Sequence, residues 1–262
     1  MFEKHFDRPF EMHEFPHFVS REELDYNLEY AKDIVENHWI WHRWRSDIDQ
    51  GGLEKTGRFK QEAEKIVAHG GLILEICAGP AGGYVPAVLL RDYEANIMIN
   101  DLCPTVVREW QNLFNNMDNP PPNVEYAAFN VCDIPFVDDC IDVISGYSAI
   151  INIEGGGDAR NEALREIYRV LKPGGLFVCN FMYVTEEFYN SMPTHARKII
   201  KERYPKLFWD TLSDFDKLEF SQVDTLSTGT WSNENDESTL ADLCRSLNVS
   251  LTFSEFMRFC IK

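Results

Sequence analysis

The sequence predicts an α/β fold built on a doubly wound, mostly parallel sheet. Short apolar runs of strand length alternate with helical patterns between residues 61 and 182, and a glycine-rich turn follows the first run. The chain also ends in a further strand-like run. Alternating strands and helices form βαβ units, whose parallel strands are covered by helices on both faces.

Five apolar runs in this region have the length of strands and are flanked by turn residues or helical patterns. They are Leu72–Ile76, Ile97–Ile99, Val124–Phe129, Ile141–Ser145 and Leu176–Met182. A helical stripe lies before the last run, at Leu164, Ile167, Tyr168 and Leu171. Pro173, Gly174 and Gly175 then stop that helix.

The sheet region is preceded by a segment, residues 1–60, that predicts a helical cap. It is rich in aromatic residues and histidine, and Ser20 with Glu23 forms a capping box at the start of a helix. Apolar residues follow the box at helical spacing, at Leu24, Leu28, Ala31 and Val35.

The C-terminal part predicts an insert and then a return to the sheet. Residues 183–237 replace the alternation by a charged, aromatic stretch and a polar run, which is typical of a lid or an edge of a ligand cleft. A helix over about Thr239–Leu247 follows, and strand-like runs end with Phe256–Ile261. We therefore assign residues 61–182 and 238–262 to one sheet domain.

The charge balance of the chain disfavours two classes of binding partner. The chain of 262 residues has 43 acidic against 25 basic side chains, a formal charge of −18, which disfavours nucleic acid and anionic membranes. The basic cluster from Arg197 to Lys206 indicates either an anionic partner or the solvated face of a helix. Because no apolar run approaches the roughly 20 residues of a membrane span, and no secretory signal begins the chain, we expect a soluble, cytoplasmic protein.

The cysteines and histidines predict neither disulfides nor a metal site. The seven cysteines are odd in number and contain no C-x-x-C pair, so we expect reduced and mostly buried thiols. His38 and His42 are four residues apart, but no third ligand follows at a spacing typical of metal sites.

The first strand runs directly into a glycine-rich turn, Cys77-Ala78-Gly79-Pro80-Ala81-Gly82-Gly83, and a helical pattern follows. A strand, a glycine-rich turn and a helix form the nucleotide-binding corner of a doubly wound sheet. Glycine allows the sharp turn and the close approach of a ligand to the backbone. The second strand ends in Asp101, where a carboxylate is placed to accept hydrogen bonds from ribose hydroxyls; a helix N-cap is the structural alternative.

These residues resemble class I methyltransferases that use S-adenosylmethionine, and the resemblance covers residues 61–182 and the C-terminal tail. Glu75 and Gly79 match the acid and the central glycine of the family's first motif, whereas Cys77 and Ala81 stand where the family has glycine. The resemblance implies a Rossmann-like sheet whose final strand is antiparallel.

Later segments match the family in the same order along the chain. Residues 130–144 resemble the stretch that binds the adenine and leads into the fourth strand, so Asn130 or Asp133 is expected at the adenine amino group, with the Val131 backbone near the ring. Residues 169–176 resemble the turn into the fifth strand, in which Lys172–Gly175 is structural. The implied donor contacts are Glu75, Ala78, Gly79, Pro80, Asp101, Leu102, Asn130, Val131, Asp133 and Ser148.

In this family the acceptor lies near the loop after the fourth strand. Here that loop lacks the Asn-Pro-Pro-Tyr signature of enzymes that methylate planar amino groups. Asn152 and Glu154 are candidates for orienting or deprotonating the acceptor, although a carboxylate beside three glycines is also typical of a solvated loop. Trp41 and Trp44 either contact the acceptor from a lid or pack the N-terminal cap onto the sheet.

The sequence therefore predicts methyl transfer from S-adenosylmethionine to a small-molecule acceptor, with no metal and no nucleic-acid partner. A protein or RNA acceptor is the main alternative. A nicotinamide-dependent oxidoreductase is disfavoured by Cys77 at the first glycine position and by the antiparallel tail. A cofactor-binding scaffold without catalysis is the non-enzymatic alternative, and Cys77 and Ala81 favour it.

Overall fold

The computed structural model describes residues 2–8, 29, 31–37, 57–67, 70–79, 95–146, 149–153, 156–184, 186–203, 217–232, 239–249 and 252–262. The helices are η1 (Phe2–His5), α3 (Gly57–Val67), α5 (Pro104–Asn115), η3 (Ile150–Asn152), α6 (Gly156–Val170), α7 (Glu186–Ser191), α8 (Thr194–Arg203) and α10 (Thr239–Ser246). The strands are β1 (Leu72–Glu75), β2 (Asn96–Asp101), β3 (Val124–Ala128), β4 (Ile141–Gly146), β5 (Leu171–Tyr183), β6 (Gln222–Ser232) and β7 (Thr252–Ile261).

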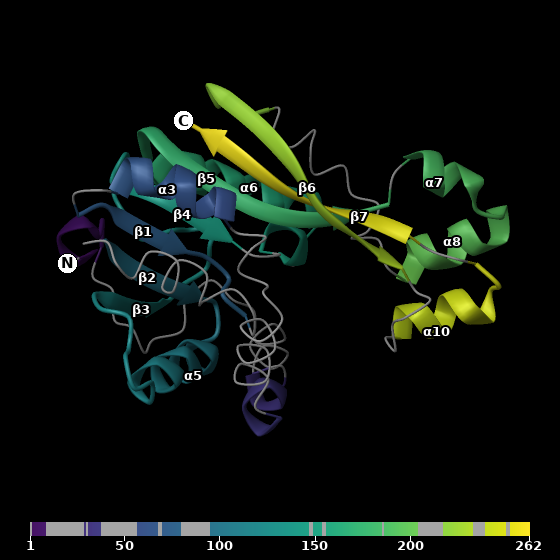
Figure 1. Ribbon diagram of the computed structural model, residues 1–262, viewed down its shortest axis with the longest axis horizontal. Helices are drawn as coiled ribbons and strands as arrows, with labels where there is room; N and C mark the ends of the chain where they lie inside the picture. Colours follow the sequence, from purple (N-terminus) through teal and green to yellow (C-terminus); the bar gives the residue numbers. More distant parts are fainter. Residues whose placement is uncertain are drawn as a thin grey trace.

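The strands form one seven-stranded sheet in the order β3-β2-β1-β4-β5-β7-β6. The first five of these are parallel to one another, whereas β7 lies antiparallel between β5 and β6 (Figure 1). The predicted parallel sheet with an antiparallel final strand is confirmed. The strand order reverses between β1 and β4, which is where ligands bind in open sheets of this kind.

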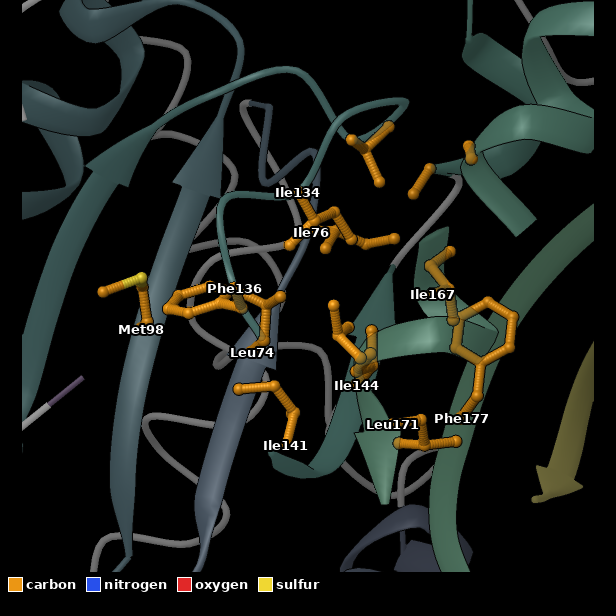
Figure 2. Packing of buried hydrophobic residues seen from close by; sticks show 14 of the residues in the cluster. Leu74, Ile76, Met98, Ile134, Phe136, Ile141, Ile144, Ile167, Leu171 and Phe177 are labelled. Carbon is orange, nitrogen blue, oxygen red and sulfur yellow. The ribbon is translucent and has the colours of Figure 1, made fainter. Parts of the chain in front are cut away.

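Alternate side chains of the central strands pack into two separate cores, because successive residues of a strand point to opposite faces. Leu74 and Ile76 face the core covered by α6, together with Phe136 and Phe177 (Figure 2). Ile73, Ile97 and Ile99 face the opposite core, which is covered by α3 and α5. Helices on both faces leave the carboxyl edge of the parallel strands as the place for a site.

Three helices form a module of their own beyond the carboxyl end of β5. Helices α7, α8 and α10 lie together at the far end of the long β5–β7–β6 ribbon (Figure 1). A small apolar cluster, centred on Met192, Ala196, Ile200 and Cys244, holds them together. The module thus lies on the side of the sheet to which the parallel strands point.

The structure differs from the sequence prediction at two places. Leu171, assigned to the helical stripe, is the first residue of β5, because it pairs with Ile141 and three extra residues form a bulge before Leu176 pairs with Val143. Residues 222–232, assigned to the insert, form the edge strand β6. That strand was missed because residues 222–225 are exposed on both faces and show no alternation.

The predicted helix after Ser20 is described only in part. Residues 31–36 are helical, and Ala31 and Ile34 are buried. The helix expected after the glycine-rich turn lies outside the described residues. The division into cap, sheet domain and insert stays a prediction, and α3 crosses the boundary at residue 60.

Candidate active site

The turn after β1 has two residues with left-handed backbone, at the carboxyl edge of the sheet. Cys77 has φ of +49° and Gly79 has φ of +47°. Glycine adopts this conformation freely, whereas a side chain at Cys77 makes it cost about 1 kcal/mol or more. The family pattern has glycine at the position of Cys77, and the backbone here keeps the conformation that glycine favours.

Asp101, at the end of β2, lies directly beside this turn. Its Oδ2 atom accepts a hydrogen bond from the Gly79 N–H at 2.9 Å, and its Oδ1 atom accepts one from the Cys103 N–H at 2.9 Å. Burial raises the pKa of the Asp101 carboxyl above its ordinary value, although backbone N–H donors act in the opposite direction. The carboxylate therefore links the turn to the start of α5 while its side chain stays partly exposed.

Asn100, which the sequence analysis missed, ties together the ends of three strands. Its side chain is fully buried, and its Nδ2 donates to the carbonyl of Phe129 at 3.0 Å. Its Oδ1 accepts from the Cys77 N–H at 3.4 Å, and its own carbonyl accepts from the Ala78 N–H at 2.8 Å. The available signal was a polar residue inside an otherwise apolar strand.

Glu75 lies beneath the turn rather than at its surface. It is fully buried, and its Oε2 accepts a hydrogen bond from the hydroxyl of Ser145, which faces it on the neighbouring strand β4. Ser145 was not singled out from the sequence. The pair forms a polar floor between the two central strands, at the point where the strand order reverses.

The stretch after β3 turns back on itself through Asn130. The Oδ1 of Asn130 accepts the Cys132 N–H at 2.9 Å, and its carbonyl accepts the Asp133 N–H at 3.0 Å. Val131 is buried beneath this turn, whereas Asn130 is partly exposed. The turn brings Asn130 to the same edge of the sheet as Asp101, because β3 runs parallel to β2.

Asp133 is held by the N-terminal segment, residues 2–8, which we call the N-terminal strap. Arg8 donates to both carboxylate oxygens of Asp133, at 3.0 and 2.5 Å, and this bonding raises the pKa of Arg8. Phe6 stacks on Phe136 with ring centroids 4.9 Å apart, and the His5 carbonyl accepts the Val137 N–H at 2.9 Å. The strap therefore fixes the loop that follows the Asn130 turn.

Helix α6 holds the same loop from inside. Arg169 donates to the carbonyls of Ile134 and Phe136, at 2.8 and 2.6 Å, and Glu166 accepts the Ile134 N–H at 2.9 Å. The carboxylates around Arg169 raise its pKa. The loop is thus fixed on both sides by charged hydrogen bonds, which are stronger than neutral ones.

Comparison with known proteins relates this geometry to a family. Residues 76–179 match the family described as a methyltransferase domain. This stretch of the chain is similar to the class I S-adenosylmethionine-dependent methyltransferases. The chain is 26% identical over 137 residues to the ubiquinone/menaquinone biosynthesis C-methyltransferase UbiE of Marinomonas sp., covering 52% of this chain and 53% of that protein. It is 29% identical over 145 residues to UbiE of Hydrogenovibrio crunogenus, with 54% of each covered.

The chain therefore spans about half the length of these curated relatives. Its fold resembles YcgJ of Bacillus subtilis, with a TM-score of 0.55 at 16% identity over 80% of this chain and 98% of that one. It also resembles a phosphoethanolamine N-methyltransferase of Haemonchus contortus, with a TM-score of 0.58 at 15% identity over 95% of this chain and 61% of that one.

The structure describes the predicted acceptor residues only in part. Asn152 lies in η3 with an exposed side chain, close to the start of α6. The remaining predicted site residues lie outside the described residues; they are Trp41, Trp44, Pro80, Ser148 and Glu154. The assignments of all these residues to donor or acceptor stay predictions.

A surface cleft of about 790 Å³ lies beside the edge strand β3. Its walls are formed by Phe6 and Arg8 of the N-terminal strap, by β3 and by the C-terminal half of α5. The amino end of β3, at Val124, and the loop before it complete the walls. The lining of this cleft includes neither Asp101 nor Gly79.

Two further findings concern metals and membranes. Among the described residues, no group of three or more His, Cys, Asp or Glu side chains is arranged to hold a metal ion. No helix in the described part of the chain is long and apolar enough to cross a membrane.

The turn at residues 172–175 was predicted to be structural. Lys172 pairs with Asp142 at 2.8 Å there, and Gly174 has φ of +78°.

Proposed function

We propose that this chain transfers the methyl group of S-adenosylmethionine to a small-molecule acceptor. The observation that carries the proposal is the contact of Asp101 with the Gly79 turn, at the ends of two adjacent parallel strands. This is the corner at which doubly wound sheets bind adenosine-containing ligands. The similarity to this family gives the ligand its chemical class.

The described residues fit such a donor. Among the described residues, a Cβ built on Gly79 would meet only the Cys77 carbonyl, at an ordinary contact distance of 3.8 Å. Asp101 is partly exposed and retains acceptor capacity for ribose hydroxyls. Asn130 supplies an amide at the same edge, with Val131 beneath it.

Each end of the donor has its own residues in this proposal. Asp101 binds the ribose, with the Leu102 backbone beside it, and the Ala78–Gly79 turn receives the amino acid end. Asn130 and Asp133 are both candidates for the adenine; the Asn130 Oδ1 also accepts the Cys132 N–H, and the Asp133 carboxylate is also paired with Arg8. Glu75 acts from below, as a buried carboxylate beneath a ligand that carries positive charge.

The donor supplies an electrophilic methyl group on a positively charged sulfur. The protein then needs to align the acceptor and exclude water, and positioning of this kind supplies much of the rate. Glu154 remains the proposed base for an acceptor that carries a proton, and Asn152 its orienting partner. Trp41 and Trp44 remain proposed acceptor contacts.

A small acceptor is favoured by the surroundings of the site. The chain is strongly acidic, and the module of α7, α8 and α10 follows β5 on the side of the carboxyl edge. On the basic face of α8, Arg197 and Lys201 lie over the ring of Tyr189, at 5.5 and 5.7 Å. The relatives named for ubiquinone and menaquinone biosynthesis make an aromatic carbon acceptor the first class to test.

Calorimetric titration with S-adenosylmethionine, S-adenosylhomocysteine and NAD tests the donor. We expect heat from both adenosyl ligands and none from NAD; the reverse result would overturn the proposal. A screen of small quinols and phenols, read by release of S-adenosylhomocysteine, tests the acceptor. Donor binding without turnover of any small, peptide or RNA acceptor would favour a scaffold without catalysis.

A further inference from the structure

Trp110 links the hydrophobic core to the donor-binding turn. It lies on α5, its side chain is fully buried, and its indole Nε1–H donates to the carbonyl of Gly79 at 2.8 Å. The two residues are 31 positions apart. An indole in a core needs a partner for its N–H, and here the partner is the turn itself.

Gly79 is consequently held from both sides. Its N–H donates to Asp101 at 2.9 Å, and its carbonyl accepts from Trp110. The N–H belongs to the peptide that enters Gly79 and the carbonyl to the peptide that leaves it. With φ at +47°, the two hydrogen bonds fix both peptide planes and so the direction in which the chain leaves the turn.

The two residues that hold Gly79 differ in what else they do. Asp101 is a partly exposed residue whose carboxylate is the proposed ribose ligand, whereas Trp110 is fully buried. A substitution of Asp101 therefore changes ribose binding and the turn together. A substitution of Trp110 changes the turn and the core packing but removes no proposed ribose contact.

We propose that Trp110 is a positioning residue for the amino acid end of the donor, which the proposed function places at the Gly79 turn. The residue acts through the Gly79 carbonyl and does not touch the donor. Without the indole N–H, the carbonyl loses its partner and the turn samples other orientations. The proposal rests on the proposed function and adds a residue outside the family's first motif.

Two ligands that differ only in the amino acid end provide the test. S-adenosylhomocysteine carries that end, whereas methylthioadenosine keeps the adenine, the ribose and the sulfur. For Trp110→Phe we expect the Kd of S-adenosylhomocysteine to rise about tenfold, in line with one lost hydrogen bond. The Kd of methylthioadenosine should change less than about twofold, because Asp101 and Asn130 are intact.

Equal weakening of both ligands would overturn the proposal, because it would indicate general loosening of the fold. Unchanged affinity for both would overturn it as well. Failure of the wild-type protein to bind either ligand would instead overturn the proposed function, and the positioning role with it. The three outcomes are therefore distinguishable in one set of titrations.

Two matched controls separate positioning from packing. Phe114→Leu removes a ring that lies 5.7 Å from that of Trp110 on the same helix, without touching the hydrogen bond. It should lower the Tm and leave the ratio of the two Kd values unchanged. Replacement of Trp110 by the isosteric benzothienylalanine exchanges only the N–H for sulfur, so it should reproduce the Trp110→Phe ratio in a fully packed core.

Discussion

The donor turn and the module of α7, α8 and α10, which is labelled in Figure 1, are held by different forces. At the turn, buried polar side chains such as Asn100 and Trp110 bond to backbone groups of other elements. In the module, a small apolar cluster around Ile200 holds the helices. A hydrogen-bonded network specifies one geometry, whereas apolar packing tolerates rearrangement.

The largest effect is expected at Asn100. Asn100→Ala leaves the Phe129 carbonyl and the Cys77 N–H without their partner, so we expect a loss of about 4 kcal/mol in the free energy of unfolding. Urea unfolding measures the loss, and affinity for S-adenosylhomocysteine should fall with it. Asn115→Ala, at an exposed position of α5, should stay within about 0.5 kcal/mol of the wild type. A mild effect of Asn100→Ala would remove the contrast between the two regions.

Ile200 offers the converse experiment in the module. Ile200→Ala creates a cavity at a fully buried position of this cluster, which costs about 3 kcal/mol of local stability. Because the cluster is separate from the turn, affinity for S-adenosylhomocysteine should not change. Hydrogen exchange should show faster opening of α8 and α10 with unchanged protection of β1 and β2. Weakened donor binding in this variant would show that the two regions are coupled.

The N-terminal strap should have a smaller and salt-dependent effect. Arg8 and Asp133 are each more than a third exposed, so their ion pair is expected to stabilise by about 0.5 kcal/mol at low salt. Arg8→Ala should therefore weaken S-adenosylhomocysteine about twofold at low salt and less at high salt. Lys4→Ala, on the same strap, is the control. In a double-mutant cycle, independent effects of Arg8→Ala and Asp133→Ala would contradict this account.

A small net effect is expected for Cys77→Gly. Cys77→Gly relieves the left-handed strain but increases the entropy of the unfolded chain, so the net change should be below about 1 kcal/mol. Cys77→Val places a β-branched side chain at the same φ of +49° and should destabilise by about 1 to 2 kcal/mol more than Gly. Thermal unfolding compares the pair. Equal stability of the two variants would mean that the backbone relaxes at this position.

The contrast between long-range hydrogen bonds and local apolar packing also explains how much of the structure the sequence could predict. The apolar strands and Asp101 were found because their signals are local, namely a run of apolar residues and a carboxylate that follows one. The role of Arg8 was missed because its partner lies 125 positions away. Ser145 and Glu75 lie side by side because of the register between β1 and β4, and no periodicity in the sequence reveals that register. Trp110 follows the pattern of an ordinary core residue of α5.

The edge strand β6 was missed for a related reason. Val223 is 42% exposed, and its neighbours are polar, so the strand buries too little to show a period of two. Its pairing with β7 depends on backbone hydrogen bonds, which every sequence can make. The structure of a segment that is held by backbone hydrogen bonds or by distant side chains cannot be predicted from a single sequence.

Titration of S-adenosylhomocysteine into Asp101→Asn tests the central claim most directly, with Asp118→Asn as an exposed control. Asn keeps the size of the side chain but replaces the charged acceptor of the Gly79 N–H and of the proposed ribose hydroxyls. We expect the Kd to rise at least about tenfold for Asp101→Asn, because hydrogen bonds to a charged group are lost, and not to change for Asp118→Asn. Wild-type affinity in Asp101→Asn would contradict the assignment of the donor to the ends of β1 and β2.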